Sequence, residues 1–258
     1  MKQAVLSLSG GMDSTCLLLH LLSEGYAVKA YSFRYGQKHA IELDKVQGTV
    51  KFLQSKNLPL SHQIIDVTDC FNESASSLTK VSGVEIPEGS YKDENMKSTV
   101  VENRNVIFAS IVYGKALAWS NKSGGKEVNI FLGVHAGDHT IYPDCTPESQ
   151  AALEHAFKVS NWNSDKVSYE APFMFLDKSE VLAAGVKAMK SLGFNEEEVE
   201  FVLAHTHTCY NPSETGKACG RCGSCNERIL AFEANGMKDP VEYQDSWEEV
   251  LNFAKNQQ

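Results

Sequence analysis

The chain has 258 residues, of which 42% are hydrophobic, and its formal net charge is −9 at pH 7. This length and apolar content suffice for a packed core. No apolar run approaches the roughly 18 residues of a membrane span, so we expect a cytoplasmic globular protein without a signal peptide. The acidic balance argues against an extended nucleic-acid-binding surface and favours a small-molecule substrate.

The first predicted elements are a short strand over residues 4–8 and a helix over residues 16–22, joined by the sequence S-G-G-M-D-S-T at 9–15. The two glycines let the backbone approach a ligand, and the start of the helix attracts an anion through its unpaired N–H groups and its dipole. The stretch lacks both the lysine of a Walker A loop and the spacing of a dinucleotide-binding fingerprint. We therefore predict an anion-binding loop of a different kind, with Asp13 and Ser14 in the first turn of the helix. A plain helix cap is the alternative.

A second strand is predicted over residues 28–33, and a third over residues 62–67. Between them, apolar residues at helical spacing indicate a helix that packs on the sheet through Leu43, Val46, Val50 and Leu53. Open α/β sheets bind their ligands at the C-terminal edge of the strands. We therefore expect three polar residues that follow the second strand to lie near the nucleotide, namely Gln37, His39 and Glu42.

Residues 68–99 show no periodicity and are rich in serine and glycine, so we interpret them as a lid or dimer-contact loop rather than a linker. Asn103 is expected to cap the next helix. Arg104 at the start of that helix opposes the dipole, which favours a role in binding a phosphate or a planar carboxylate over simple exposure. One face of this helix is expected to be formed by Val106, Ile107, Ser110, Ile111 and Leu117.

Residues 128–134 read as a buried parallel strand. The polar stretch at 135–145 follows it, and we predict an acceptor pocket there, in which Asp138 and Asp144 accept N–H donors from a base-like ring. A capped surface loop is the alternative. Further helices are expected over residues 147–159 and 178–192, with a short last strand over residues 173–176. Lys178, at a helix start near the strand edges, is a candidate cation for a phosphate or leaving group.

Four of the seven cysteines lie close together in the sequence, whereas the other three are scattered. Four thiolates at this spacing predict a closed, structural, tetrahedral zinc site in a reducing compartment. An iron–sulfur cluster is the main alternative. The predicted ligands are Cys209, Cys219, Cys222 and Cys225.

Taken together, these blocks resemble the QueC/ExsB family of the PP-loop ATP pyrophosphatase superfamily, and the likeness runs through nearly the whole chain. The sequence departs from the family pattern at Glu102, where a proline is usual, and at residues 140–141, where Ser-Gly is usual. Both departures are expected to line the acceptor side of the site. The motifs that carry the resemblance are S-G-G-M-D-S-T at 9–15, Y-G-Q-K-H at 35–39 with Glu42, Arg104-Asn105, residues 133–138, Y-P-D-C at 142–145, Asp177-Lys178, and T-C-Y-N at 208–211 with the cysteine motif at 219–226.

The resemblance implies a doubly wound, mainly parallel α/β sheet of five strands, like that of the adenine-nucleotide α-hydrolases and Rossmann-like proteins, with a C-terminal zinc-binding helical segment. It divides the chain into a PP-loop ATP-binding catalytic domain over residues 1–200, with residues 68–99 as a lid-like insertion, and a zinc-binding segment over residues 201–258. It also implies a homodimer.

The activity that the resemblance implies starts with adenylation of the carboxylate of 7-carboxy-7-deazaguanine by ATP. Ammonia then displaces AMP to give an amide, and a second activation dehydrates the amide to 7-cyano-7-deazaguanine, or preQ0, for queuosine biosynthesis. The implied cofactors are one structural Zn²⁺ per chain and Mg²⁺ with ATP. A paralogue using another acceptor, a PP-loop tRNA-thiolating enzyme and a non-catalytic nucleotide-binding module stay open as alternatives.

The resemblance also assigns site residues. The expected catalytic residues are Asp13, Ser14 and Lys178. The expected ATP-binding residues are Leu8, Ser9, Gly10, Gly11, Met12, Asp13, Ser14, Thr15 and Phe33. The expected substrate-binding residues are Tyr35, Gln37, His39, Glu42, Arg104, Asn105, Asp138, Tyr142 and Asp144.

Overall fold

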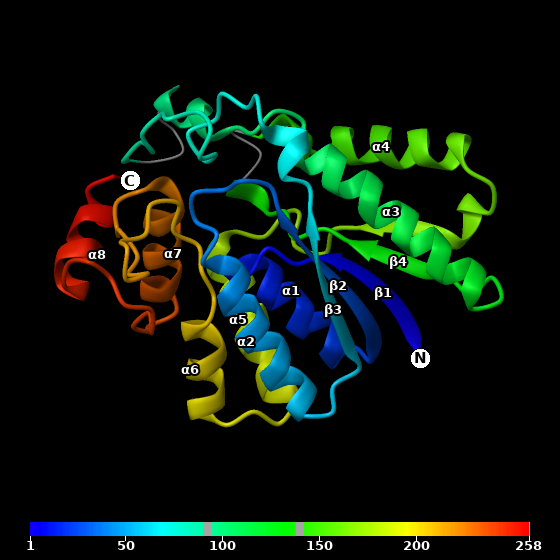
Figure 1. The fold of residues 1–258 in the computed structure, drawn as a ribbon. Helices are drawn as coiled ribbons and strands as arrows, with labels where there is room; N and C mark the ends of the chain where they lie inside the picture. The colour runs from blue at the N-terminus through cyan, green and yellow to red at the C-terminus, as the bar shows by residue number, and fades with distance from the viewer. Residues whose placement is uncertain (90–93, 138–141, 258) are drawn as a thin grey trace.

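A five-stranded parallel sheet forms the centre of the molecule in the computed structural model, which describes residues 1–89, 94–137 and 142–257 (Figure 1). The strand order is β3-β2-β1-β4-β5, and every neighbouring pair is parallel. Because the order reverses at β1, the connections leaving its two sides diverge and open a crevice at the C-terminal edge. The predicted fold class is confirmed. The strands are β1 Lys2–Ser7, β2 Tyr26–Arg34, β3 Leu60–Asp66, β4 Val128–Phe131 and β5 Val167–Glu170.

Helices cover both faces of the sheet (Figure 1). Successive residues of β1 point to opposite faces, so Leu6 packs in the cluster formed with α1, α2 and α5, whereas Val5 packs in the cluster formed with α3. The helix α4 lies beside β5. These helices are α1 Met12–Ser23, α2 Glu42–Ser55, α3 Arg104–Lys122, α4 Pro147–Ser160 and α5 Lys178–Ser191.

The contact between α1 and α5 is unusually close because Gly185 provides no side chain. A Cβ added there would lie 2.3 Å from the Sγ atom of Cys16. Both helices begin at the C-terminal edge of the sheet, so this packing sets the start of α5 beside the start of α1. It therefore fixes Lys178 relative to Asp13.

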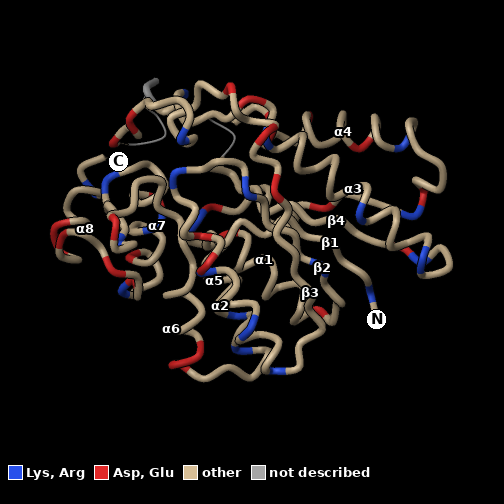
Figure 2. The backbone as a smooth tube through the Cα atoms, viewed as in Figure 1, with Lys and Arg blue, Asp and Glu red and all other residues tan. Residues whose placement is uncertain are grey.

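The C-terminal part of the chain forms three further helices, α6 Glu196–Ala204, α7 Gly223–Ala234 and α8 Trp247–Lys255. Figure 2 shows acidic residues at the start of α6 and in α8. There they complement the positive end of the helix dipole, and both helices carry reciprocal capping boxes. Within the described residues, none of the helices combines the length and the apolar character needed to cross a bilayer.

The last strand was misplaced in the sequence prediction. Residues 173–176 form turns closed by the bonds Met174 N–H to Ala171 O and Leu176 N–H to Phe173 O, and the fifth strand is β5 at residues 167–170. The apolar run at 173–176 reflects burial of Phe173 and Met174 in a turn, not strand pairing. β4 is also shorter than predicted, and the residues after Phe131 lead to the site.

The predicted buried face of α3 is also wrong. Its buried residues are Ala109, Val112, Tyr113, Ala116 and Ser120, whereas Phe108, Ile111 and Leu117 are only partly buried. The side chain of Asn103 makes no capping hydrogen bond; its backbone has a positive φ of 54°.

Residues 68–89 and 94–99 are irregular apart from the 3₁₀ turns Thr68–Phe71 and Glu94–Thr99, and they lie beyond the C-terminal edge of the sheet (Figure 1). Glu102 ties this segment to α3, since it accepts hydrogen bonds from the Ser74 hydroxyl (2.6 Å) and the Ala75 N–H (3.1 Å). It lines neither of the cavities described below, so it does not belong to the acceptor wall where we expected it.

Candidate nucleotide and acceptor site

The loop between β1 and α1 is shaped by Gly10, whose φ of +90° favours glycine. A Cβ there would lie 2.9 Å from the Glu42 carbonyl oxygen, so the loop packs directly on the start of α2. Ser9 Oγ accepts from the Gly11 N–H (3.2 Å) and lies 3.0 Å from Ser14 Oγ. The loop is thus held open, with the first turn of α1 presenting its N–H groups to the crevice.

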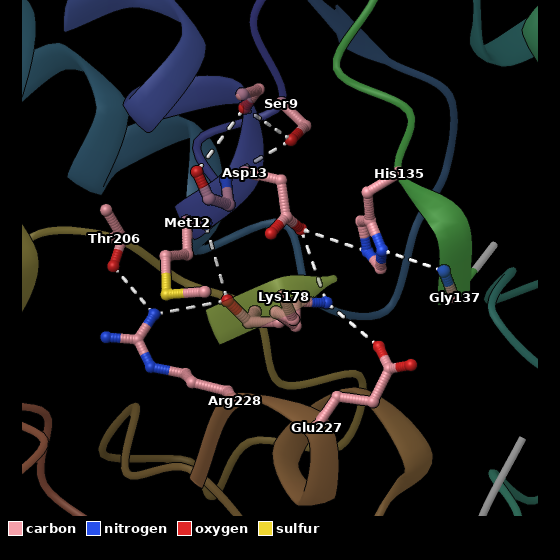
Figure 3. Close-up of polar contacts among 12 residues, drawn as sticks. Ser9, Met12, Asp13, His135, Gly137, Lys178, Thr206, Glu227 and Arg228 are labelled. Atoms are coloured by element: carbon pink, nitrogen blue, oxygen red, sulfur yellow. Dashed lines mark hydrogen bonds and ion pairs between the residues drawn. The ribbon is translucent and has the colours of Figure 1, made fainter. Parts of the chain in front are cut away.

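Asp13 lies in a charged cluster formed by three different elements (Figure 3). Its Oδ2 atom is 3.3 Å from Nζ of Lys178 on α5, and the same Nζ is 3.0 Å from Oε2 of Glu227 on α7. His135, which follows β4, approaches Asp13 Oδ2 at 4.0 Å through Nε2. Because His135 Nδ1 accepts the Gly137 N–H at 3.1 Å, the neutral ring carries its proton on Nε2, facing the carboxylate.

The charge of Asp13 is maintained despite burial. Burial acts to raise the pKa of this carboxyl, but Lys178, through its charge and its hydrogen bond, and the nearby His135 ring outweigh it and lower the pKa below its ordinary value. The second oxygen, Oδ1, is buried and receives no hydrogen bond from any described residue. A buried anionic oxygen without a donor is suited to a metal ligand in an ATP site.

The C-terminal segment braces the loop from the other side. The His207 N–H donates to the Gly10 carbonyl at 2.8 Å, and the Met12 N–H lies 3.5 Å from Thr208 Oγ1. Arg228 on α7 in turn donates to the hydroxyls of Thr208 (3.1 Å) and Thr206 (2.7 Å). Figure 3 shows this connection from α7 to the loop.

Two adjoining cavities lie at the C-terminal edge of the sheet. The β2 cavity, of about 210 Å³, is lined by the loop, the residues after β2 and Lys178, and the β4 cavity, of about 240 Å³, lies between the loop, α3 and the residues after β4. The two share one wall, so ligands in them would meet there. The shared residues are Ser7, Ser9, Asp13, Arg104, Asn105, Phe108 and Tyr210.

The β2 cavity is lined by some of the predicted ATP-binding residues and by some of the predicted substrate-binding residues. Among the predicted ATP-binding residues, Leu8, Ser9, Gly11, Asp13 and Phe33 line it, Ser14 lines the β4 cavity, and Gly10, Met12 and Thr15 line neither. Phe33 is stacked on Phe108, with ring centroids 4.0 Å apart. Of the predicted substrate-binding residues, Tyr35, His39 and Glu42 line the β2 cavity.

Gln37 lies behind the wall of the β2 cavity and lines neither cavity. Its amide nitrogen donates to the Phe33 carbonyl (3.0 Å) and to Glu42 Oε1 (2.9 Å), and its amide oxygen accepts from the Tyr35 N–H (2.9 Å). With both ends of the amide used, Gln37 positions the loop after β2.

The titratable groups of this cavity are strongly affected by burial. Burial lowers the pKa of His39 to about 3 and raises the pKa of Glu42 to about 8. It also raises the pKa of the Tyr35 hydroxyl to about 12. At neutral pH His39 and Tyr35 are therefore uncharged, and most of the Glu42 carboxyl is protonated, with the carboxylate as the minor form.

The β4 cavity is lined by Arg104, Asn105, Tyr142 and Asp144, four of the residues expected to bind the substrate. Arg104 donates to the Tyr35 hydroxyl at 3.3 Å, with its guanidinium over the Tyr35 ring. The Tyr142 hydroxyl lies 2.9 Å from Thr99 Oγ1, so the end of the 68–99 segment supports this wall. Asp138 and residues 140–141, which were also expected here, lie outside the described residues.

The four predicted metal ligands converge. The sulfur atoms of Cys209, Cys219, Cys222 and Cys225 all lie within 4.8 Å of one another. Cys219 Sγ accepts the N–H groups of Arg221 and Cys222, both at 3.4 Å, which favours a thiolate. Gly220 makes the tight turn, because its φ is +72° and a Cβ would lie 2.3 Å from Val250. The cluster could bind a metal such as zinc.

Several residues of the site could not be identified from sequence periodicity. His135, Glu227, Arg228 and His207 come from distant parts of the chain, and only the fold brings them to the loop. The resemblance pointed to the blocks at 133–138 and 208–211, which contain His135 and Tyr210, but not to their contacts.

A larger groove of about 950 Å³ lies between α5, α6 and residues 237–241, away from the loop. It is lined mainly by apolar side chains such as Val186, Phe194 and Met237 and contains none of the loop residues. Volume is a poor guide to chemistry here, and the two smaller cavities carry the converging polar groups.

The comparisons with known proteins agree with this geometry. A family model described as "Queuosine biosynthesis protein QueC" matches residues 3–236. The chain is 42% identical over 242 residues to a 7-cyano-7-deazaguanine synthase of Caldicellulosiruptor saccharolyticus, covering 94% of this chain and 96% of that one. It is 40% identical over 244 residues to the synthase of Pseudoalteromonas atlantica (94% and 99% covered) and 41% identical over 236 residues to that of Marinobacter nauticus (92% and 95% covered). This chain therefore belongs to the QueC family.

Proposed function

We propose that this chain converts 7-carboxy-7-deazaguanine and ammonia to 7-cyano-7-deazaguanine at the expense of two ATP molecules, for queuosine biosynthesis. The observation that carries the proposal is the shared wall of the two cavities, where Asp13 of the phosphate loop meets Arg104 of the acceptor side. Membership of the QueC family and the names of the relatives support it.

In the first step, ATP lies with its phosphates against the first turn of α1, and Lys178 faces the leaving pyrophosphate. The substrate carboxylate, oriented by Arg104, attacks the α-phosphorus, and the bond to the β-phosphate oxygen breaks. Adenylation turns a poor leaving group into a good one. Mg²⁺, which Asp13 would hold through its unpaired Oδ1, supplies charge neutralisation for the phosphates when bound.

Ammonia then attacks the acyl carbon, AMP departs, and a primary amide remains after loss of a proton. The second ATP is consumed in the same way: the amide oxygen attacks the α-phosphorus and pyrophosphate leaves. Loss of AMP and of the two amide protons gives the nitrile. The same loop can serve both activations because the reacting oxygen occupies the same position relative to ATP.

The acceptor ring is proposed to bind in the β4 cavity. Phe108, Leu132 and Leu153 offer apolar walls to a flat ring, while Tyr142 and Asp144 add polar groups. The pyrimidine edge of a deazaguanine carries N–H donors, and a carboxylate accepts them. A paralogue that adenylates a related carboxylate for another amine would use the same contacts, so the products decide between the two.

Replacing Asp144 with alanine is expected to lower kcat/KM for the deazaguanine carboxylate. The expected loss of transition-state stabilisation is about 2–4 kcal/mol, because N–H donors of the ring would lose their acceptor. Calorimetric ATP binding is expected to be unchanged. Mass spectrometry of the products from ATP, ammonia and 7-carboxy-7-deazaguanine measures the effect, with the exposed Asp165→Asn as matched control. If Asp144→Ala turns over as well as its parent, the ring does not bind there; if the parent makes AMP only with another carboxylate, the proposed substrate is wrong.

We propose that the four-cysteine cluster holds one structural zinc ion. The four thiolates leave no position for a substrate, and the ion would join the tail to α7 through Cys222 and Cys225. Residues 1–200 would then form the ATP-binding catalytic domain, with residues 68–99 as its lid-like insertion, and residues 201–258 the zinc-binding segment of a homodimeric protein.

Elemental analysis of the purified protein is expected to give one zinc per chain, and Cys222→Ser is expected to lower that content and the melting temperature together. The distant thiol variant Cys70→Ser, which changes an exposed cysteine, should change neither. A visible absorption band from iron and sulfide in anaerobically prepared protein would contradict the assignment to zinc.

A further inference from the structure

Glu42, the first residue of α2, lines the β2 cavity but is only 7% exposed. One carboxylate oxygen, Oε1, accepts from Gln37 Nε2 at 2.9 Å and lies 3.7 Å from His39 Nε2. No described residue donates a hydrogen bond to the other oxygen, Oε2. The side chain is thus held at one oxygen while the other is available to a small ligand.

The carboxyl group is fixed relative to the phosphate loop. The Glu42 carbonyl lies against Gly10, where a Cβ would come within 2.9 Å, so a shift of α2 would displace the loop as well. Arg104, which lines both cavities, is near enough for its charge to influence Glu42. Glu42 therefore lies in the β2 cavity, which adjoins the shared wall where the acyl adenylate of the proposed reaction would form.

Among the described residues, only His39 lies close enough to form an ion pair with Glu42. This pair requires that the imidazole of His39 be protonated. Burial opposes that protonation and lowers the pKa of His39 to about 3, and the hydroxyl of Tyr35, which follows β2, is uncharged at neutral pH. Burial also raises the pKa of Glu42 to about 8, with Gln37 and Arg104 opposing the rise. A carboxylate in this state is a much stronger proton acceptor than an exposed glutamate.

We propose that Glu42 accepts a proton from the ammonium ion that supplies the amide nitrogen, and so generates ammonia beside the acyl adenylate. The inference rests on the proposed function and adds a catalytic residue to it. Ammonium is the main form of this nucleophile at neutral pH, and it has no lone pair for attack. The imidazole of His39 is uncharged, so it adds no repulsion to that of Arg104 and Lys178, which also line this cavity.

The atoms balance as follows. An N–H bond of ammonium breaks and its proton passes to the Glu42 carboxylate, leaving the lone pair on nitrogen. That pair forms the C–N bond at the acyl carbon, and the C–O bond to AMP breaks with its electrons on the phosphate oxygen. The nitrogen then loses one further proton to solvent as the neutral amide forms.

The test compares two nucleophiles in wild-type protein and in Glu42→Gln. Hydroxylamine is largely unprotonated at neutral pH, so it needs no base before it attacks and gives a hydroxamate. Glutamine keeps an acceptor for Gln37 and a similar volume. Adenylation alone is measured in each variant by the exchange of labelled pyrophosphate into ATP. This exchange depends on 7-carboxy-7-deazaguanine and is followed without any amine present.

We expect Glu42→Gln to keep pyrophosphate exchange within about twofold of wild type, and to lose on the order of 10²–10⁴-fold in amide formation from ammonium. Hydroxamate formation should fall by much less. The control Asp44→Asn, an exposed carboxylate on the same helix, should leave all three rates unchanged.

Equal losses with ammonium and hydroxylamine would overturn the inference. So would a loss of exchange or a raised KM for the deazaguanine carboxylate in that assay, because Glu42 would then serve adenylation or bind the ring. Wild-type protein that shows no exchange with this carboxylate would instead overturn the proposed function, so the two failures are distinguishable.

Discussion

Replacing Lys178 with methionine is expected to lower the rate of carboxylate-dependent pyrophosphate exchange by about 10³-fold, the size of effect seen when a preorganised charge is removed from a developing anion. Lys178 is buried, and its Nζ lies 3.3 Å from Asp13 and 3.0 Å from Glu227. It is thus fixed beside the phosphate loop before ATP arrives. Methionine keeps the length of the side chain but leaves the departing pyrophosphate without this cation.

The same substitution leaves two carboxylates facing each other, so a loss of stability has to be separated from a loss of catalysis. The double variant Lys178→Met with Glu227→Gln removes one of these charges and is expected to recover part of the melting temperature but none of the activity. Lys187→Met, an exposed change on the same helix, is the control. Recovery of exchange in the double variant would show that Lys178 acts only on folding.

Arg228→Met is expected to lower the stability by about 3–5 kcal/mol, because it leaves a buried carboxylate without its cation. Arg228 is 1% exposed and binds both oxygens of Asp239 at 2.6 and 2.9 Å, and it also donates to Thr206, Thr208 and the Leu203 carbonyl. For a chain of this size the melting temperature should fall by roughly 10 °C.

The matched control is Arg221→Met, which breaks a 2.7 Å ion pair with Asp245 between partly exposed side chains. Its expected cost is at most about 1 kcal/mol. Adding Asp239→Asn to Arg228→Met should restore part of the loss by removing the unpaired charge. Thermal unfolding followed by circular dichroism measures all four proteins, and equal melting temperatures for Arg228→Met and Arg221→Met would contradict the argument.

The features predicted best from the sequence were those encoded locally. The loop at 9–15 lies between a strand and a helix, the stripe of Leu43, Val46, Val50 and Leu53 is buried, and the four cysteines converge. In each case, periodicity or close spacing within a short window carries the information.

The errors arose where the burial of a residue does not indicate its secondary structure. Phe173 and Met174 are buried in turns, whereas β5 contains polar Ser168 and Glu170 and pairs only with β4 at the edge of the sheet. On α3 the buried residues include Ala109 and Ala116, which hydrophobic periodicity weighs lightly.

The site contacts across the fold could not be predicted for a different reason. Glu227 pairs with Lys178, and His135 with Asp13, only because α7, α5 and the end of β4 converge on one edge. Glu102 was expected at the acceptor side because of its place in a motif. Its hydrogen bonds hold the 68–99 segment instead.

The bracing of the loop by α7 bears on the order in which the chain becomes functional during synthesis. The strand β1 and its loop leave the ribosome early, but Thr208, Glu227 and Arg228 emerge only after β5 is complete. Until they dock, the loop lacks its support and Lys178 lacks its ion pair with Glu227. Under the proposed function, a partly made chain would be unable to adenylate a carboxylate, because the C-terminal segment has to fold before the loop is braced.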